Sequence, residues 1–280
     1  KMKIKRRAAA ALKALMCAAV LFIALFPIYW LLAMAVRPAE EMSGRISLLP
    51  QSFTAEHFVR LFDSKDFGLA IANSLQTTGV SLVFSLIIGI CAAYVIARHR
   101  FRFGLKRPLT YWILLVRVLP PVAFTIPLYT MFGKAGILGT KWPVILACVL
   151  INVPLIIWFL ISFFRELPEE IEESAKVDGA TEWQLFCRVV LPLVAPGIAA
   201  VAMLSFMYAW NEYTYTVIFT RSPGNYTVPL ALSVLNTEDN LTNFGLVSAG
   251  GVISVVPIML FVIFAQNYLI SGLSSGAVKE

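Results

Sequence analysis

Charged residues are scarce in this sequence, and so are the residues that build catalytic and metal sites. Only 14% of the 280 residues are charged, against about 25% in an average soluble domain. The two histidines, His57 and His99, fall in opposite loops, and the four cysteines have no metal-like spacing. No glycine-rich phosphate loop followed by lysine is present, which excludes ATP hydrolysis by the chain itself. These absences argue against an enzyme.

Long apolar runs dominate what is present. Hydrophobic residues make up 59% of the chain, and its mean hydropathy is +0.79. A helix that crosses a bilayer needs on the order of 20 apolar residues. Six stretches qualify, and they are residues 15–36, 70–97, 109–132, 142–164, 189–220 and 244–270. The sequence therefore predicts an all-α membrane protein with six transmembrane helices, in which the four cysteines fill the core.

The basic residues predict how these helices are oriented. A formal charge of +7 is also typical of nucleic-acid binding, but here the lysines and arginines gather at the ends of apolar runs, before the first and after the second. The positive-inside rule places both segments, and with six spans both termini, in the cytoplasm. The opening KMKIKRR and its apolar run resemble a secretory signal. We expect a retained first span because the run is too long and lacks a small-residue cleavage site.

A charged stretch, residues 167–192, interrupts the apolar sequence between the fourth and fifth predicted spans. It reads LPEEIEESAKVDGATEWQLFCRVVLP. Pro168 and the glutamates after it indicate a helix start, and Gly179 indicates its end. Thr181 and Gln184 fit a capping box at a second helix start. We expect a short surface helix, a glycine turn, and a second helix that bends at Leu191-Pro192 and continues into the fifth span. A nucleic-acid-binding helix-turn-helix is disfavoured because the loop is acidic.

This stretch resembles the EAA loop of permease subunits of ABC-type importers, which docks into a cleft on a cytoplasmic ATPase. Ser174 stands where the pattern has its first alanine, and Val189 where it has isoleucine. Both changes are small or conservative. The resemblance implies a cytoplasmic coupling helix between the fourth and fifth spans. Together with the acidic helix start, the resemblance indicates these coupling residues: Glu172, Glu173, Ala175, Asp178, Gly179, Ala180, Leu191 and Pro192.

Two weaker motifs resemble the maltose-type carbohydrate branch of that family. LLPQSFTAEHFVRLF, residues 48–62, is similar to its outer loop, and SGLSSGAVKE, residues 271–280, to a tail that reaches toward the ATPase. The resemblance divides the chain into 1–69, a permease core at 70–270 and a cytoplasmic tail at 271–280. It implies import of a sugar or sugar derivative by alternating access across a prokaryotic cytoplasmic membrane. The implied partners are a second homologous permease, two ATPase subunits that bind ATP and Mg, and an extracytoplasmic binding protein.

Polar residues inside the predicted spans are the candidates for a substrate path. An ionised carboxylate in lipid is costly unless it faces water or a partner, and aromatic neighbours suit a sugar ring. The candidates are Asn152, Asn211, Glu212, Tyr215 and Arg117. Each has a plainer interpretation. Glu212 could equally lie at the outer membrane–water interface, where a carboxylate is already solvated. The Asn152 side chain could form a hydrogen bond between helices, and the Arg117 side chain could extend to the interface or form an ion pair.

Three other functions are compatible with parts of the sequence. A permease for a polyamine, peptide or phosphate would carry the same charged hairpin, since the hairpin does not encode the substrate. An ATP-independent transporter or channel is expected to show repeated halves or paired intramembrane charges, and neither is found. A membrane enzyme is disfavoured because no catalytic cluster is evident.

Overall fold

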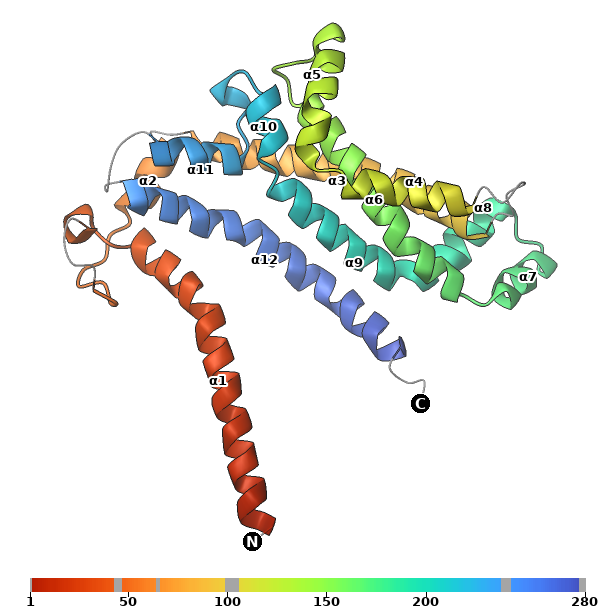
Figure 1. The fold of residues 1–280 in the computed structure, drawn as a ribbon, viewed down its shortest axis with the longest axis horizontal. Coiled ribbons are helices and arrows are strands. Elements are labelled where there is room, and N and C mark those ends of the chain that lie inside the picture. Colours follow the sequence, from red (N-terminus) through yellow and green to blue (C-terminus); the bar gives the residue numbers. More distant parts are fainter. Residues whose placement is uncertain (1, 43–46, 64–65, 99–105, 238–242, 277–280) are drawn as a thin grey trace. The chain divides into compact units, whose positions relative to one another are not determined.

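The computed structural model describes residues 2–42, 47–63, 66–98, 106–237 and 243–276, and every regular element in these residues is helical (Figure 1). Most of the basic loop after the second span, including His99, and the last four residues of the expected tail lie outside them. Contacts divide the chain into two compact units. One comprises residues 1–68 and 232–256, and the other 69–231 and 257–280. The expected boundaries near residues 69 and 270 stay a prediction.

The first unit is held together by buried polar groups near the outer loop. It contains α1 (Met2–Ala35), the 3-10 turn η1 (Ala39–Met42) and α2 (Glu56–Asp63), which lies in the segment of residues 48–62 that resembles the family's outer loop. Arg37 and His57 are both buried. The His57 ring donates from Nε2 to the Arg37 carbonyl oxygen over 2.9 Å, because a carbonyl can only accept. α2 is thereby fixed against the end of α1.

The second unit is built around α6 (Trp142–Glu166), which packs against α4 (Lys106–Val118) and α9 (Leu191–Trp210). These helices and most of α3 (Phe67–Arg98) belong to this unit (Figure 1). One apolar cluster joins three of the helices, with Ala93 from α3, Leu160 from α6 and Val194 from α9 among its buried members. The segment that connects α6 to α9 lies within the charged stretch, residues 167–192.

Within the described residues, five helices are long and apolar enough to cross a membrane, and there are six spans if a bent pair of helices counts as one. The five cover residues 10–35, 67–98, 142–166, 182–210 and 244–264. The bent pair joins α4 to α5 (Thr125–Lys134) through η3 (Pro121–Phe124), at 99°. Pro120 and Pro121 explain the bend, because two adjacent residues without N–H groups cannot continue a helix. The third predicted span is therefore not a straight helix.

The fifth predicted span also differs from the expectation that it runs to residue 220. α9 ends at Trp210, and the separate helix α10 (Thr214–Phe219) follows. The Glu212 carboxylate accepts hydrogen bonds from the backbone N–H groups of Tyr215 and Thr216, at 2.6 and 3.0 Å. A side chain that satisfies free N–H groups starts a new helix, so the chain breaks here and not at the end of the apolar run.

The remaining elements, η5, α11 and α12, follow α10 in the sequence. The turn η5 (Pro223–Asn225) is held to α3 by the Asn73 amide, which donates to the carbonyls of Gly224 and Tyr226. α11 (Val228–Thr237) and α12 (Asn243–Gly276) follow, so the expected tail is helical as far as residue 276. All four cysteines are free, and only Cys148 is buried. Cys17 and Cys91 are exposed, so the expectation that all four fill the core was wrong.

Candidate functional site

The charged stretch forms a helical hairpin, and its first helix is α7 (Glu169–Val177). Pro168 occupies the N-cap position, one residue before the position expected for it. Glu169, Glu170 and Glu172 lie in the first turn. Negative charge there offsets the positive end of the helix dipole, so the sequence favours a helix start at this point without help from the rest of the fold.

α7 ends in a Schellman motif. Gly179 has φ +85°, a left-handed backbone conformation that a residue with a Cβ adopts only with strain. The Ala180 N–H donates to the Ala175 carbonyl over 3.0 Å, and the Gly179 N–H donates to the Lys176 carbonyl over 3.1 Å. These two bonds close the helix and reverse the chain. The predicted helix stop is thus present in the structure.

The second helix of the hairpin starts at a capping box. The Gln184 N–H donates to the Thr181 hydroxyl over 3.3 Å, and the Thr181 N–H donates to the Gln184 side-chain oxygen over 3.0 Å. α8 (Glu182–Gln184) passes directly into a π turn, η4 (Leu185–Val190), and then into α9. Pro192 accounts for the wide turn, because it has no N–H and its ring crowds the carbonyl of Arg188. The second helix is therefore continuous with α9, as expected.

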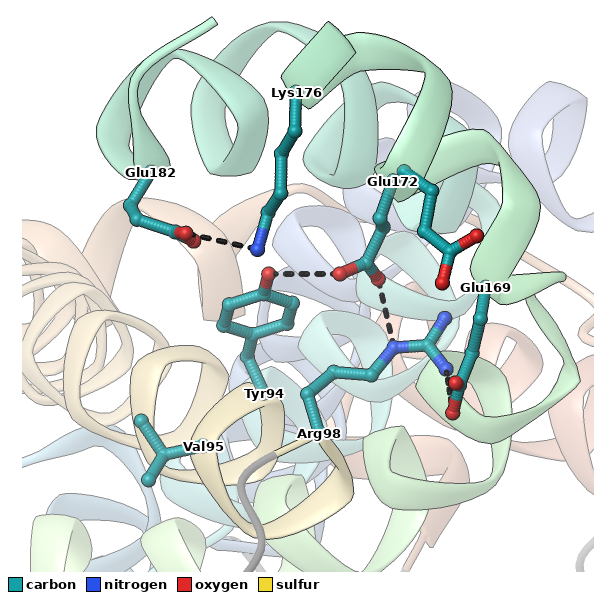
Figure 2. Close-up of a pocket in the computed structure, with 8 residues that line it drawn as sticks. Tyr94, Val95, Arg98, Glu169, Glu172, Lys176 and Glu182 are labelled. Carbon is teal, nitrogen blue, oxygen red and sulfur yellow. Dashed lines mark hydrogen bonds and ion pairs between the residues drawn. The ribbon is translucent and has the colours of Figure 1, made fainter.

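A polar cluster joins the hairpin to the end of α3 (Figure 2). The Arg98 guanidinium forms an ion pair with Glu172, with 2.7 Å between Nε and Oε1, and donates from Nη2 to the Leu167 carbonyl over 2.8 Å. The Tyr94 hydroxyl donates to the other carboxylate oxygen of Glu172 over 3.2 Å. Glu169 lies at the edge of the cluster, 3.9 Å from Arg98. Two side chains of α3 thus hold one carboxylate of α7.

A second ion pair closes the hairpin on itself. Lys176 Nζ lies 2.8 Å from the Glu182 carboxylate, across the glycine turn. The hydrogen bond with Glu182 raises the pKa of Lys176 above its usual value. Both side chains are largely exposed, so the surrounding water weakens this ion pair.

The two ion pairs line an open cavity of about 470 Å³ under the hairpin (Figure 2). Its charged lining residues are Arg98, Lys176, Glu169, Glu172, Glu173 and Glu182. Carboxylates outnumber cations, so the cavity has a negative potential. No group of side chains that could hold a metal ion occurs in the described residues. The lining therefore offers ion-pairing groups in a cavity that is open to solvent.

The hairpin also exposes apolar side chains. Val177 is 87% exposed at the tip of α7, and Trp183 on α8 is 70% exposed. Both side chains therefore lie on the surface of the hairpin, close in sequence to its charged residues. Of the other predicted coupling residues, Asp178 is exposed, and Ala175 and Leu191 are partly buried. Ala175 packs against the apolar cluster that joins α3, α6 and α9.

The five substrate-path candidates differ in their burial and in their hydrogen bonds. The Asn152 amide is fully buried and donates to the Ser205 carbonyl over 3.3 Å, which links α6 to α9. Asn211 is exposed, and its amide donates back to Met207 over 2.8 Å. Arg117 is exposed near the end of α4, with its guanidinium carbon 6.0 Å from the centre of the Tyr208 ring.

The side chains of Glu212 and Tyr215 form hydrogen bonds within the fold. Besides its two backbone donors, the Glu212 carboxylate accepts from the Thr216 hydroxyl over 3.0 Å. Tyr215 is fully buried, and its hydroxyl donates to the Pro121 carbonyl over 3.0 Å. The Glu212 bonds hold the start of α10, and the Tyr215 bond fixes α10 to the turn between α4 and α5. Whether the two residues also contact substrate stays a prediction.

Arg98 and Tyr94 are the site residues that sequence reasoning missed. In the sequence, Arg98 is only one of the basic residues that follow the second apolar run. The spacing of four between Tyr94 and Arg98 places both on one side of α3, and Glu172 was already a candidate. Nothing in the linear sequence, however, joins α3 to a hairpin more than 70 residues away.

The apolar helices and the capped hairpin define a multi-pass membrane component of the transporter type. A family model confirms this class over residues 85–275. The chain belongs to the family of binding-protein-dependent transport system inner membrane components. Members of this family are permease subunits without catalytic activity of their own, as expected for this chain.

Individual relatives align over almost the whole chain. The trehalose transport system permease protein of Mycobacterium tuberculosis is 33% identical over 258 residues, which cover 91% of this chain and 93% of that protein. The diacetylchitobiose uptake system permease protein of Streptomyces coelicolor is 34% identical over 264 residues, or 94% and 95% of the two chains.

Solved structures share the fold. A chain from a bacterial ABC transporter that imports the acidic polysaccharide alginate matches with a TM-score of 0.78 and 23% identity. The match covers 94% of this chain and 96% of that one. At this identity the likeness shows the fold alone.

Proposed function

We propose that this chain is the permease subunit of an ATP-driven importer that carries a sugar or sugar derivative across the cytoplasmic membrane of a prokaryote. Relatives that align end to end are named for trehalose, diacetylchitobiose and arabinooligosaccharides. These are neutral or amide-bearing saccharides. Their shared chemistry favours a carbohydrate over a polyamine, peptide or phosphate as the substrate.

The observation that carries the transport mechanism is the hairpin and its continuity with α9. α7 is the coupling helix that docks on a cytoplasmic ATPase, and the exposed Val177 and Trp183 supply apolar contact area. Glu172, Glu173, Asp178, Gly179 and Ala180 shape or line the docked part, and Leu191 and Pro192 join it to α9. When ATP closes the ATPase pair, α7 moves, and the continuous helix transmits this motion to α9 and the passage.

The remaining parts of the transporter follow from this assignment. Two ATPase subunits bind ATP and Mg, a second homologous permease completes the passage, and an extracytoplasmic binding protein delivers the sugar. The bent pair α4 and α5 counts as one span, so the chain crosses the membrane six times with both termini in the cytoplasm. Exposed Asn211 and Arg117 are the substrate-path candidates that a solute reaches without rearrangement of this chain.

Co-purification and uptake test this proposal. The full chain, co-expressed with its ATPase and second permease, is isolated in mild detergent and reconstituted with its binding protein into proteoliposomes. We expect the subunits to purify together and labelled di- or oligosaccharide to enter only with ATP. ATP-dependent uptake of a non-sugar solute alone, or an active transporter made of this chain alone, would overturn the proposal.

A variant of the glycine turn tests the hairpin itself. Gly179→Pro is incompatible with φ +85° because proline fixes φ near −65°. We expect the variant to insert in the membrane but to lose uptake and the stimulation of ATP hydrolysis by substrate. Normal uptake by a correctly inserted Gly179→Pro variant would exclude the hairpin as the coupling element.

A further inference from the structure

We propose that the Arg98–Glu172 ion pair makes α3 a second path for coupling, parallel to the backbone path through α9. This inference rests on the proposed function, because it assumes that α7 docks on an ATPase. Arg98 and Tyr94 are then positioning residues. They touch neither substrate nor nucleotide, but they fix the coupling helix to a membrane helix distant in the sequence.

The contacts of Arg98 hold the start of α7 from two directions. The guanidinium donates to the Leu167 carbonyl before the helix over 2.8 Å and forms an ion pair with the Glu172 carboxylate in its first turn, with 2.7 Å between Nε and Oε1. Tyr94, one helical turn earlier on α3, donates to the same carboxylate. A planar guanidinium with several fixed donors restricts both the position and the direction of its partner. α7 therefore cannot rotate or slide without displacing the end of α3 or breaking these bonds.

Burial distinguishes this ion pair from the other pair in the hairpin. The Arg98 and Glu172 side chains are 14% and 13% exposed, whereas Lys176 and Glu182 are 49% and 77% exposed. A shielded pair is screened little by salt, and loss of one partner leaves the other charge in a poorly hydrated place. The Lys176–Glu182 pair joins only α7 to α8, so it cannot carry motion to α3.

The neighbouring glutamates have different surroundings. Glu173 is exposed at the rim of the cavity, and Glu170 is exposed on α7. Glu172 has its carboxylate between Tyr94 and Arg98 (Figure 2). Of these three acidic residues of α7, Glu170 and Glu173 are therefore exposed, whereas Glu172 contacts the side chains of α3. We infer that ATP-driven movement of α7 moves the cytoplasmic end of α3 together with α9.

Coupling measurements on the reconstituted transporter test the inference. Arg98→Gln and Glu172→Gln each remove one charge of the pair with little change in volume. We expect both variants to assemble with the ATPase and hydrolyse ATP, but to transport about tenfold less solute per ATP. Arg98→Lys keeps the charge without the fork of donors, so its coupling should lie between those of Arg98→Gln and wild type. Arg165→Gln makes the same substitution at an exposed arginine near the end of α6, outside the cavity lining, and as the matched control it should couple like wild type.

A distance measurement separates a mechanical role from a purely structural one. Spin labels are placed on the native Cys91 of α3 and on Glu170→Cys of α7, with the other cysteines replaced. In the wild-type background we expect one narrow distance distribution that nucleotide leaves unchanged. In the Arg98→Gln background it should broaden and change when ATP is added.

The possible outcomes distinguish the two proposals. Wild-type coupling by Arg98→Gln and Glu172→Gln, or distances unaffected by Arg98→Gln, would overturn this inference and leave the proposed function intact. Equal loss of coupling in the Arg165→Gln control would overturn it too, because the effect would then not be specific to the link with α3. Failure of the wild-type complex to import any sugar would instead overturn the proposed function.

Discussion

The α7–α8 hairpin and the junction between α9 and α10 both carry glutamates beside aromatic residues, but they use them differently. In the hairpin, the acidic residues lie at a helix start, and most remain exposed. At the junction, the Glu212 carboxylate is buried and accepts three hydrogen bonds that start α10. Glutamates near aromatic residues therefore lie on an exposed helix start in one place, and one forms a buried structural cap in the other.

Glu212→Ala gives the largest expected effect and tests the junction side of this comparison. Two backbone N–H groups and one hydroxyl would lose a charged acceptor, so we expect a loss of about 2 to 3 kcal/mol in the free energy of unfolding. Unfolding in detergent, followed by tryptophan fluorescence, measures it. The exposed Glu166→Ala is the control and should change stability by less than about 0.5 kcal/mol. Unchanged stability with weakened uptake would make Glu212 a substrate contact.

Gly179→Ala tests the hairpin side. A Cβ at position 179 meets no other atom within 4 Å, so the only cost is the left-handed conformation, about 1 to 2 kcal/mol. Gly136, at φ +70° and equally unobstructed, provides the matched control. Both variants should show similar stability, but only Gly179→Ala should reduce the solute transported per ATP. Equal coupling defects in the two variants would mean that the turn matters for folding alone.

Tyr215→Phe removes a single hydrogen bond between α10 and the Pro121 carbonyl. We expect a loss of about 1 kcal/mol in the free energy of unfolding and no change in the sugar concentration for half-maximal uptake. Uptake at varied sugar concentration, beside an unfolding curve, makes the distinction. A large shift in that half-maximal concentration at normal stability would place the Tyr215 hydroxyl on the substrate path.

Asn152→Leu should have the smallest effect. The amide makes one long hydrogen bond, and its Oδ1 atom has no partner among the described residues, so an apolar residue of similar size replaces it at little cost. We expect stability within about 1 kcal/mol of wild type. Loss of uptake by a stable Asn152→Leu protein would contradict the interhelical interpretation and assign Asn152 to the passage.

Local signals were sufficient to predict the hairpin. The glutamates of the first turn, Gly179, and the Thr181–Gln184 capping box act within a few residues of one another, and all three are present in the structure. Hydropathy located the apolar helices but not their breaks. The third predicted span bends at Pro120-Pro121, and the fifth stops at Trp210, although apolar residues continue past both points.

The sequence by itself determined a membrane protein with a capped hairpin, because span length and helix caps are local properties, and the resemblance of the hairpin to the EAA loop indicated a permease subunit. Only the tertiary structure decided which partner each buried polar side chain binds. Arg98 reaches Glu172, Tyr215 reaches Pro121, and Asn152 reaches Ser205. Each partner comes from a different helix, and a polar group shielded from water takes whichever partner packing brings to it.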